Sequence, residues 1–165
     1  MNEIDAIQAS LATYSKRLDE VSADRLNELR KCSFFDPIPS EWLKPISEQT
    51  EIRTFSAGDC ITREGEDMNA LYVVLYGTAT AYYNKKIVGT IRSGECVGEG
   101  MYFANENLSR SATVVADGQV IAAEINKTGI ERLRGEAVVY MDKALLLALF
   151  KKLQGANRKI EDLLP

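Results

Sequence analysis

The chain has 165 residues, a net charge of −4, 45% hydrophobic residues and 27% charged residues, a balance typical of one globular domain rather than a disordered or fibrous chain. Histidine is absent. Catalytic triads and dyads that need an imidazole, and metal sites with histidine ligands, are therefore excluded. The three cysteines, Cys32, Cys60 and Cys96, form no close-spaced pair. We therefore expect reduced thiols, buried in the core, and no metal site.

Charge and hydropathy together predict a cytoplasmic protein. The first residues are acidic and lack the basic region of a signal peptide, and the longest apolar run, Ala144 to Phe150, is too short to span a membrane. The negative net charge argues against nucleic-acid and membrane partners. Residues 127–159 carry eight basic and three acidic residues, which we interpret as a solvated helix face rather than a nucleic-acid patch.

The N-terminal part is predicted to be helical. Apolar residues recur every three or four positions, which predicts one amphipathic helix over residues 1–21. This row either packs on its own domain or binds another protomer or protein. Ser22 resembles an N-cap and predicts a second helix with Leu26 and Leu29, which the prolines at 37 and 39 end before Ser40 caps a third. The row comprises Ile4, Ile7, Leu11, Tyr14, Leu18 and Val21.

From residue 51 the pattern changes to short β-branched or alternating stretches separated by turn residues. Gly77, Asn84-Lys85-Lys86 and Asp117-Gly118 are hairpin signals because such turns favour positive φ. The pattern predicts an α+β fold with an antiparallel eight-stranded β-roll (jelly-roll barrel), N-terminal helices and a long C-terminal helix. The expected strands are Glu51–Ser56, Cys60–Thr62, Ala70–Tyr76, Thr78–Tyr83, Ile87–Arg92, Cys96–Val97, Arg110–Ala116 and Gln119–Asn126.

A single long helix is expected from Thr128 to Gly155, followed by a polar tail. The predicted organisation is an N-terminal helix over 1–21, a central domain over 22–155 and a tail over 156–165. Because only ten residues follow the long helix, we expect no further output domain within this sequence.

The longest interruption in the β pattern, residues 98–114, carries the candidate site. Gly98 and Gly100 would let the backbone approach a ligand, and the N-terminus of a short helix there would attract an anion. Arg110 could bind a phosphate through two hydrogen bonds, while Glu99 could accept hydrogen bonds from ribose hydroxyls. From these residues alone, a structural ion pair between Glu99 and Arg110 remains the alternative.

The segment from Leu26 to about Leu153 resembles the cyclic-nucleotide-binding domains of catabolite activator-like regulators, kinase regulatory subunits and gated channels. The resemblance rests on an ordered set of motifs together with Glu99 and Arg110. These motifs are Leu29-Arg-Lys-Cys-Ser-Phe-Phe, Ser40-Glu-Trp-Leu, Phe55-Ser-Ala-Gly-Asp-Cys-Ile-Thr-Arg-Glu-Gly65, Leu71-Tyr-Val-Val-Leu-Tyr-Gly77, Gly94-Glu-Cys-Val-Gly-Glu99 and Arg110-Ser-Ala-Thr-Val.

The resemblance implies a role for each site residue. The acid of the Gly-Glu pair, here Glu99, would bind the ribose 2′-hydroxyl, and Arg110 would pair with the cyclic phosphate. Ser111 would add a hydroxyl or backbone N–H to the phosphate, and backbone groups of Gly100 and Met101 would contact phosphate and sugar. The implied ligand-binding set is Gly98, Glu99, Gly100, Met101, Arg110, Ser111 and Ala112.

Three departures from the family pattern concern affinity more than fold. Gly100 replaces an apolar residue, Val97 replaces an aromatic one, and the insertion-like stretch before Arg110 includes Glu106. In the family, threonine after the arginine accompanies cGMP selectivity, so Ser111 favours cAMP. The C-terminal helix of such domains closes over the base, and Arg134 and Tyr140 are the expected lid contacts.

The sequence thus predicts a cytoplasmic cyclic-nucleotide sensor, with cAMP favoured over cGMP, which changes conformation and signals through an unidentified protein partner or self-association. A homodimer would form through the N- or C-terminal helix. No cofactor, catalysis, nucleic acid or membrane is expected. The alternative is a roll that has lost nucleotide binding and acts as a scaffold. Glu99 and Arg110 favour the sensor, whereas Gly100 and Glu106 favour the scaffold.

Overall fold

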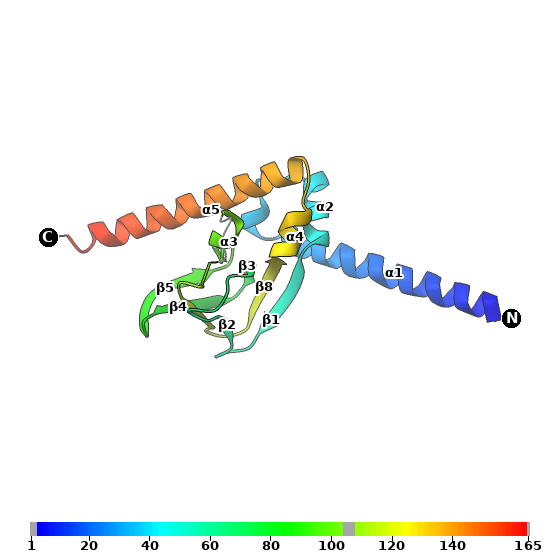
Figure 1. The fold of residues 1–165 in the computed structure, drawn as a ribbon, viewed down its shortest axis with the longest axis horizontal. Helices are drawn as coiled ribbons and strands as arrows, with labels where there is room; N and C mark the ends of the chain where they lie inside the picture. Colours follow the sequence, from blue (N-terminus) through cyan, green and yellow to red (C-terminus); the bar gives the residue numbers. More distant parts are fainter. Residues whose placement is uncertain (1–2, 104–107, 165) are drawn as a thin grey trace.

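The computed structural model describes residues 3–103 and 108–164. Eight strands form two antiparallel four-stranded sheets, which face each other beneath a layer of helices (Figure 1). The α+β roll is therefore confirmed. The strands are β1 (Glu51–Phe55), β2 (Cys60–Thr62), β3 (Ala70–Tyr76), β4 (Thr78–Tyr83), β5 (Lys86–Arg92), β6 (Cys96–Val97), β7 (Thr113–Ala116) and β8 (Val120–Asn126).

Strand order differs between the two sheets. One sheet has the order β1-β8-β3-β6 and the other β2-β7-β4-β5. Asn84 and Lys85 have φ of 48° and 63° in the turn between β4 and β5, as the hairpin prediction requires. The seventh strand begins at Thr113 instead of Arg110, because residues 108–110 pair with a loop outside the named strands.

The helices occur at both ends of the chain. The N-terminal ones are α1 (Glu3–Arg30), the 3-10 turn η1 (Ser33–Phe35) and α2 (Ser40–Glu48). The roll contains the short α3 (Gly100–Phe103), and α4 (Lys127–Arg132) and α5 (Glu136–Glu161) follow it. In Figure 1, α1 and α5 project from the body in opposite directions.

Two apolar clusters hold the fold together. The larger cluster joins the helices to β3 and β8, and it includes Leu29, Phe35, Ile46, Leu71 and Leu145, each at most 2% exposed. The smaller cluster fills the roll between β2, β4 and β7. The helical layer is thus part of the same hydrophobic core as one sheet.

The prediction of a new helix at Ser22 is wrong. Residues 3–30 form one continuous helix. No proline or glycine precedes Ser22 to end the first helix, and serine is tolerated in helix interiors. An N-cap residue therefore signals a helix start only where the preceding turn has ended.

The interpretation that the N-terminal row packs on its own domain is also wrong. Its described side chains are between 55% and 65% exposed, and the side chain of Leu18 lies outside the described part. Packing begins near Leu26 and becomes complete at Leu29. The row is formed by Ile4, Ile7, Leu11, Tyr14 and Val21.

The predicted single helix from Thr128 to Gly155 is two helices, α4 and α5. Gly135 separates them with φ of 60° and ψ of −138°, a conformation that strongly favours glycine. The predicted polar tail is also corrected, because α5 continues to Glu161. The chain therefore turns sharply after α4 before α5 crosses the helical layer.

Candidate cyclic-nucleotide pocket

A cavity of about 160 Å³ lies between the second sheet, the 98–99 segment and α5. It brings together five of the predicted site residues, Gly98, Glu99, Arg110, Ser111 and Ala112. Lys152 from α5 completes its rim, and the rest of its lining is mainly apolar. The other lining residues are Thr62, Met68, Ala81, Ile91, Val97 and Val114.

Arg110 is the central charged group of this cavity. Its side chain is buried, with the residue 6% exposed, and its Nη1 has no hydrogen-bond partner among the described residues. The guanidinium lies 5.6 Å from the centre of the Tyr72 ring, and burial lowers the pKa of Arg110. A buried cation with an unpaired donor is costly in an empty protein, so the pocket is electrostatically suited to an anion.

The backbone around Arg110 is fixed by pairing with the loop after β2. The amide of Arg110 donates to the carbonyl of Glu66 at 2.7 Å, and the amide of Gly65 donates to the carbonyl of Arg110 at 2.9 Å. The Met68 amide donates to the Leu108 carbonyl at 2.7 Å. Two sequence-distant segments thereby set the position of the arginine.

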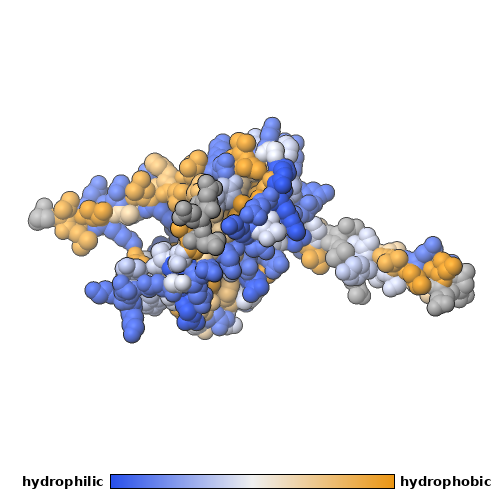
Figure 2. All heavy atoms as spheres, in the orientation of Figure 1, coloured by the Kyte–Doolittle hydropathy of each residue, from blue (hydrophilic) through white to orange (hydrophobic). Residues whose placement is uncertain are grey.

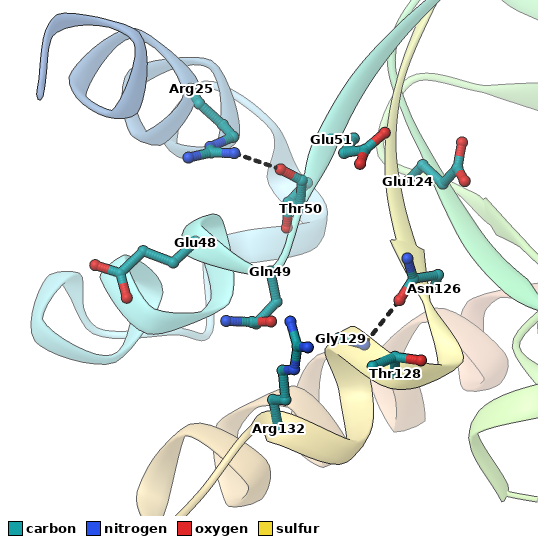
Figure 3. A pocket seen from close by; sticks show the side chains of 10 residues that line it. All are labelled: Arg25, Glu48, Gln49, Thr50, Glu51, Glu124, Asn126, Thr128, Gly129 and Arg132. Carbon is teal, nitrogen blue, oxygen red and sulfur yellow. Dashed lines mark hydrogen bonds between the residues drawn. The ribbon is translucent and has the colours of Figure 1, made fainter. Parts of the chain in front are cut away.

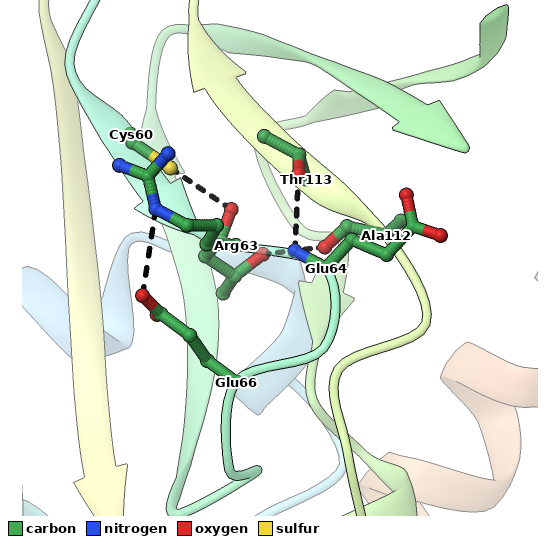
Figure 4. Close-up of polar contacts among 7 residues, drawn as sticks. Cys60, Arg63, Glu64, Glu66, Ala112 and Thr113 are labelled. Carbon is green, nitrogen blue, oxygen red and sulfur yellow. Dashed lines mark hydrogen bonds and ion pairs between the residues drawn. The ribbon is translucent and has the colours of Figure 1, made fainter. Parts of the chain in front are cut away.

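A further group of contacts fixes the residues that follow Arg110 (Figure 4). The Thr62 hydroxyl donates to the carbonyl of Ala112 at 3.3 Å, and the Glu64 amide donates to the Thr113 hydroxyl at 3.0 Å. These bonds hold β2 beside the start of β7. Ser111 lies between Arg110 and Ala112, whose backbone groups are both hydrogen-bonded, and it is exposed at the pocket.

Gly98 is required by both conformation and space. Its φ is 86°, and a side chain there would collide with the Nη1 of Arg110 and the carbonyl oxygen of Ala70. Only glycine meets both conditions without displacing the guanidinium. The Gly-Glu pair therefore lets Arg110 lie against the 98–99 backbone.

Glu99 lines the pocket and pairs with a residue of α5. Its Oε1 lies 2.5 Å from the Nζ of Lys152. The side chain of Glu99 is 19% exposed and that of Lys152 is 32% exposed, so the protein partly shields this ion pair from solvent. The predicted structural pairing of Glu99 with Arg110 is not among the described ion pairs.

Gly100 and Met101 lie beside the pocket rather than on its described lining. Met101 is 7% exposed and packs in the larger core cluster, and its amide already donates to the carbonyl of Gly98 at 3.2 Å. The short α3 that they begin turns the chain away from the cavity. Glu106, with the other residues at 104–107, lies outside the described residues.

The expected lid contacts, Arg134 and Tyr140, are not among the residues described as lining this pocket. Arg134 donates from Nη1 to the carbonyls of Glu131 and Leu133, and Tyr140 packs against the helical core. Lys152, about 18 Å further along the helix than Tyr140, reaches the pocket instead.

Sequence reasoning missed Lys152, although a signal for it exists. The buried residues Met141 and Leu145 and the half-buried Ala148 continue at a spacing of four and three residues to Lys152. This spacing places all four on one helix face. A lysine that continues a buried apolar row indicates a cation directed toward the protein.

A second cleft of about 370 Å³ lies where α1, α2, β1 and α4 meet (Figure 3). Arg25 donates to the carbonyl of Thr50 at 2.8 Å, and Asn126 caps α4 by accepting from the Gly129 amide at 2.8 Å. The charged side chains that line this cleft are two arginines and three glutamates, so the cleft carries charges of both signs. These contacts join α1 and α4 to the roll.

The cyclic nucleotide-binding domain family model matches residues 52–136, which is just over half of the chain and includes Glu99 and Arg110. The chain belongs to this family. Within the described residues, no cluster of histidine, cysteine, aspartate or glutamate suits a metal ion, and no described helix is both long and apolar enough to cross a membrane.

Curated relatives of this cyclic nucleotide-binding domain are much longer proteins. A cGMP-dependent protein kinase from Eimeria tenella is 26% identical over 113 residues, covering 68% of this chain and 11% of the kinase. The chain therefore spans about a tenth of that relative's length.

Solved structures share the fold of this domain at low sequence identity. The regulatory domain of Toxoplasma gondii PKA, crystallised with cAMP, has a TM-score of 0.61 and 22% identity, covering 74% of this chain and 48% of that chain. A regulatory subunit of a cAMP-independent protein kinase A from Trypanosoma brucei has a TM-score of 0.65 and 22% identity, with coverages of 86% and 50%.

Proposed function

We propose that the chain binds a 3′,5′-cyclic nucleotide, with its phosphate on Arg110 and its ribose 2′-hydroxyl on Glu99. The observation that carries this proposal is the buried, unpaired Nη1 of Arg110 in a cavity shared with Glu99. A cyclic phosphodiester carries one negative charge, which this guanidinium can neutralise through two hydrogen bonds. Glu99 then supplies the acceptor for the sugar.

The pocket must open for such a ligand. Its volume of about 160 Å³ is smaller than the roughly 300–1,000 Å³ of common ligand pockets. Ser111 and Ala112 also line the pocket, where they can contact a ligand. Binding therefore requires a rearrangement, which is the basis of the proposed sensor function.

We favour cAMP over cGMP, because Ser111 stands where threonine accompanies cGMP selectivity in the family. The relatives point both ways: the Eimeria tenella kinase is named for cGMP, and the Toxoplasma gondii regulatory domain was crystallised with cAMP. The domain itself acts without catalysis and without a cofactor, and its signal passes to a protein partner or a second copy in the cytoplasm. Nucleic acid and membranes are not its partners.

The second candidate function is a scaffold without nucleotide binding. The Lys152 contact favours it, because Glu99 already has a charged partner in the structure. The Trypanosoma brucei structure, described as from a cAMP-independent kinase, is consistent with a roll that does not depend on cAMP. The fold alone therefore does not decide between the two functions.

Calorimetric titration with cAMP and with cGMP distinguishes these candidates. The sensor predicts saturable binding with one nucleotide per chain and tighter binding of cAMP. The scaffold predicts no saturable heat with either nucleotide while the protein remains folded by circular dichroism. The latter result would refute the proposed function.

A further inference from the structure

Two side-chain pairs connect the 98–103 segment to α5. Glu99 pairs with Lys152 at 2.5 Å, and the Tyr102 hydroxyl donates to the Oδ1 of Asp142 at 2.6 Å. The two contact points on α5 are ten residues, or about 15 Å, apart. Only the first pair uses a group that the proposed ligand also needs.

The helix has two parts that differ in how they are held. Ala137, Met141, Ala144 and Leu145 are at most 2% exposed and anchor the first part in the core. The side chains of residues 153–164 are all exposed. The second part can therefore move with little loss of buried apolar surface.

The space beneath the second part supports this difference. Gly155 is three residues after Lys152 and shares its helix face, yet a side chain added there would meet no atom within 4 Å. Lys159 reaches toward β5, with its Nζ at 3.7 Å from the position of a side chain on Gly89. The second part of α5 thus stands away from the roll and touches it through long lysine side chains.

We propose that Lys152 is an affinity- and specificity-determining residue of the nucleotide pocket. In this structure it pairs with Glu99, and a bound ribose 2′-hydroxyl displaces it. The displacement releases the second part of α5 from the roll, while Tyr102 and Asp142 keep the first part attached. This inference rests on the proposed nucleotide binding.

The physical reason is competition for one carboxylate. A ligand shifts a conformational equilibrium only by its different affinity for the two states. A ribose hydroxyl that takes Glu99 binds only the state in which Lys152 has left. A 2′-deoxy cyclic nucleotide lacks that hydroxyl, so it binds without displacing the lysine.

The first test measures the affinities of Lys152→Met and its matched control for cAMP and 2′-deoxy-cAMP. Lys151→Met is the control, because Lys151 is the adjacent, exposed lysine on the same helix. We expect Lys152→Met to bind cAMP about three- to tenfold more tightly, the scale of a partly exposed ion pair. Its affinity for 2′-deoxy-cAMP, and both affinities of Lys151→Met, should stay at the wild-type values.

The second test measures the release of α5. Spin labels at Lys85 and Arg158, in a Cys60→Ser background, report the distance between the β4–β5 turn and the end of α5. We expect cAMP to lengthen this distance and 2′-deoxy-cAMP to leave it unchanged. Lys152→Arg, which keeps the charge, should preserve both responses.

The outcomes separate the inference from the proposed function. Equal gains for cAMP and 2′-deoxy-cAMP in Lys152→Met would show that the lysine only occupies space, and equal affinities in both lysine variants would show that it has no effect on binding. Either result overturns the inference while nucleotide binding stands. The proposed function itself is overturned if the wild type and both lysine variants fail to bind either nucleotide. The melting temperatures of the variants must then equal that of the wild type.

Discussion

At the scale of single residues, the pocket combines one guanidinium and one carboxylate in a largely apolar lining. Arg110 is buried with an unpaired donor, whereas Glu99 is held at the rim by Lys152. The two groups would thus act on different parts of a ligand. Their roles can be separated by changing the ligand as well as the protein.

Replacing Glu99 by Gln tests the sugar contact. We expect cAMP binding to weaken by about 1–3 kcal/mol, because a charge-assisted hydrogen bond becomes a neutral one. The affinity for 2′-deoxy-cAMP should not change, since this ligand makes no such bond. Calorimetry with both ligands checks the prediction, and an equal loss for both would show that the ribose role is misassigned.

The sequence predicted the pocket residues that lie together in one short segment of the chain. Glu99 and Arg110 could be found because an acid after glycine and an arginine before a strand are recognisable in order. The hydrogen bond from the Met101 amide to the Gly98 carbonyl could not be foreseen, because the partner of an amide depends on the local turn. Lys152 was missed because its contact joins residues 53 positions apart.

At the scale of the elements, a turn at Gly135 divides the helical segment that follows the roll. Its positive φ separates α4 from α5. The strands were predicted within a few residues, since turn residues mark their ends. The helix boundaries at Ser22 and Gly135 were not, because a single serine or glycine can lie within a helix or end it, and tertiary packing decides which.

Two glycine substitutions test this account with opposite signs. Gly135→Ala should lower the free energy of unfolding by about 1–3 kcal/mol, because alanine is strained at this φ and ψ. Gly155→Ala, inside α5 with open space around it, should stabilise that helix by up to about 1 kcal/mol. Urea denaturation measures both changes, and a loss of stability in Gly155→Ala equal to that in Gly135→Ala would contradict the assignment.

The N-terminal part of α1 is a second candidate surface for a binding partner. Its apolar row, from Ile4 to Val21, is exposed and spans fewer than three heptads, and most helical stability in proteins comes from packing of an apolar face. We expect this row to bind a second copy or a protein partner.

Removing residues 1–21 tests the prediction for self-association. The intact chain should sediment as a larger species than the shortened one. Leu11→Glu should have the same effect as the deletion, whereas Ala9→Glu, on the opposite face of α1, should have none. If all four proteins sediment with the same number of chains per particle, the row does not mediate self-association.

At the scale of the whole molecule, the domain is a roll with two projecting helices. Apolar residues gather on both projections in the space-filling view (Figure 2), and they include Leu146, Phe150 and Leu153 on α5, each more than half exposed. Movement of α5 would therefore change the position of an apolar surface. The helix α5 would thus carry both a residue that responds to the ligand and an apolar surface for a partner.

Arg110 carries the central claim, that a cyclic nucleotide binds in this pocket through its phosphate. Calorimetry of the wild type, Arg110→Ala and Arg110→Met with cAMP tests it most directly, with melting temperatures of the empty proteins as the folding control. Removing an unpaired buried cation should leave the empty protein folded. We predict that both variants lose about 2–5 kcal/mol of binding free energy, as expected when a desolvated phosphate loses its charge partner. Folded variants that bind cAMP as tightly as the wild type would contradict the claim.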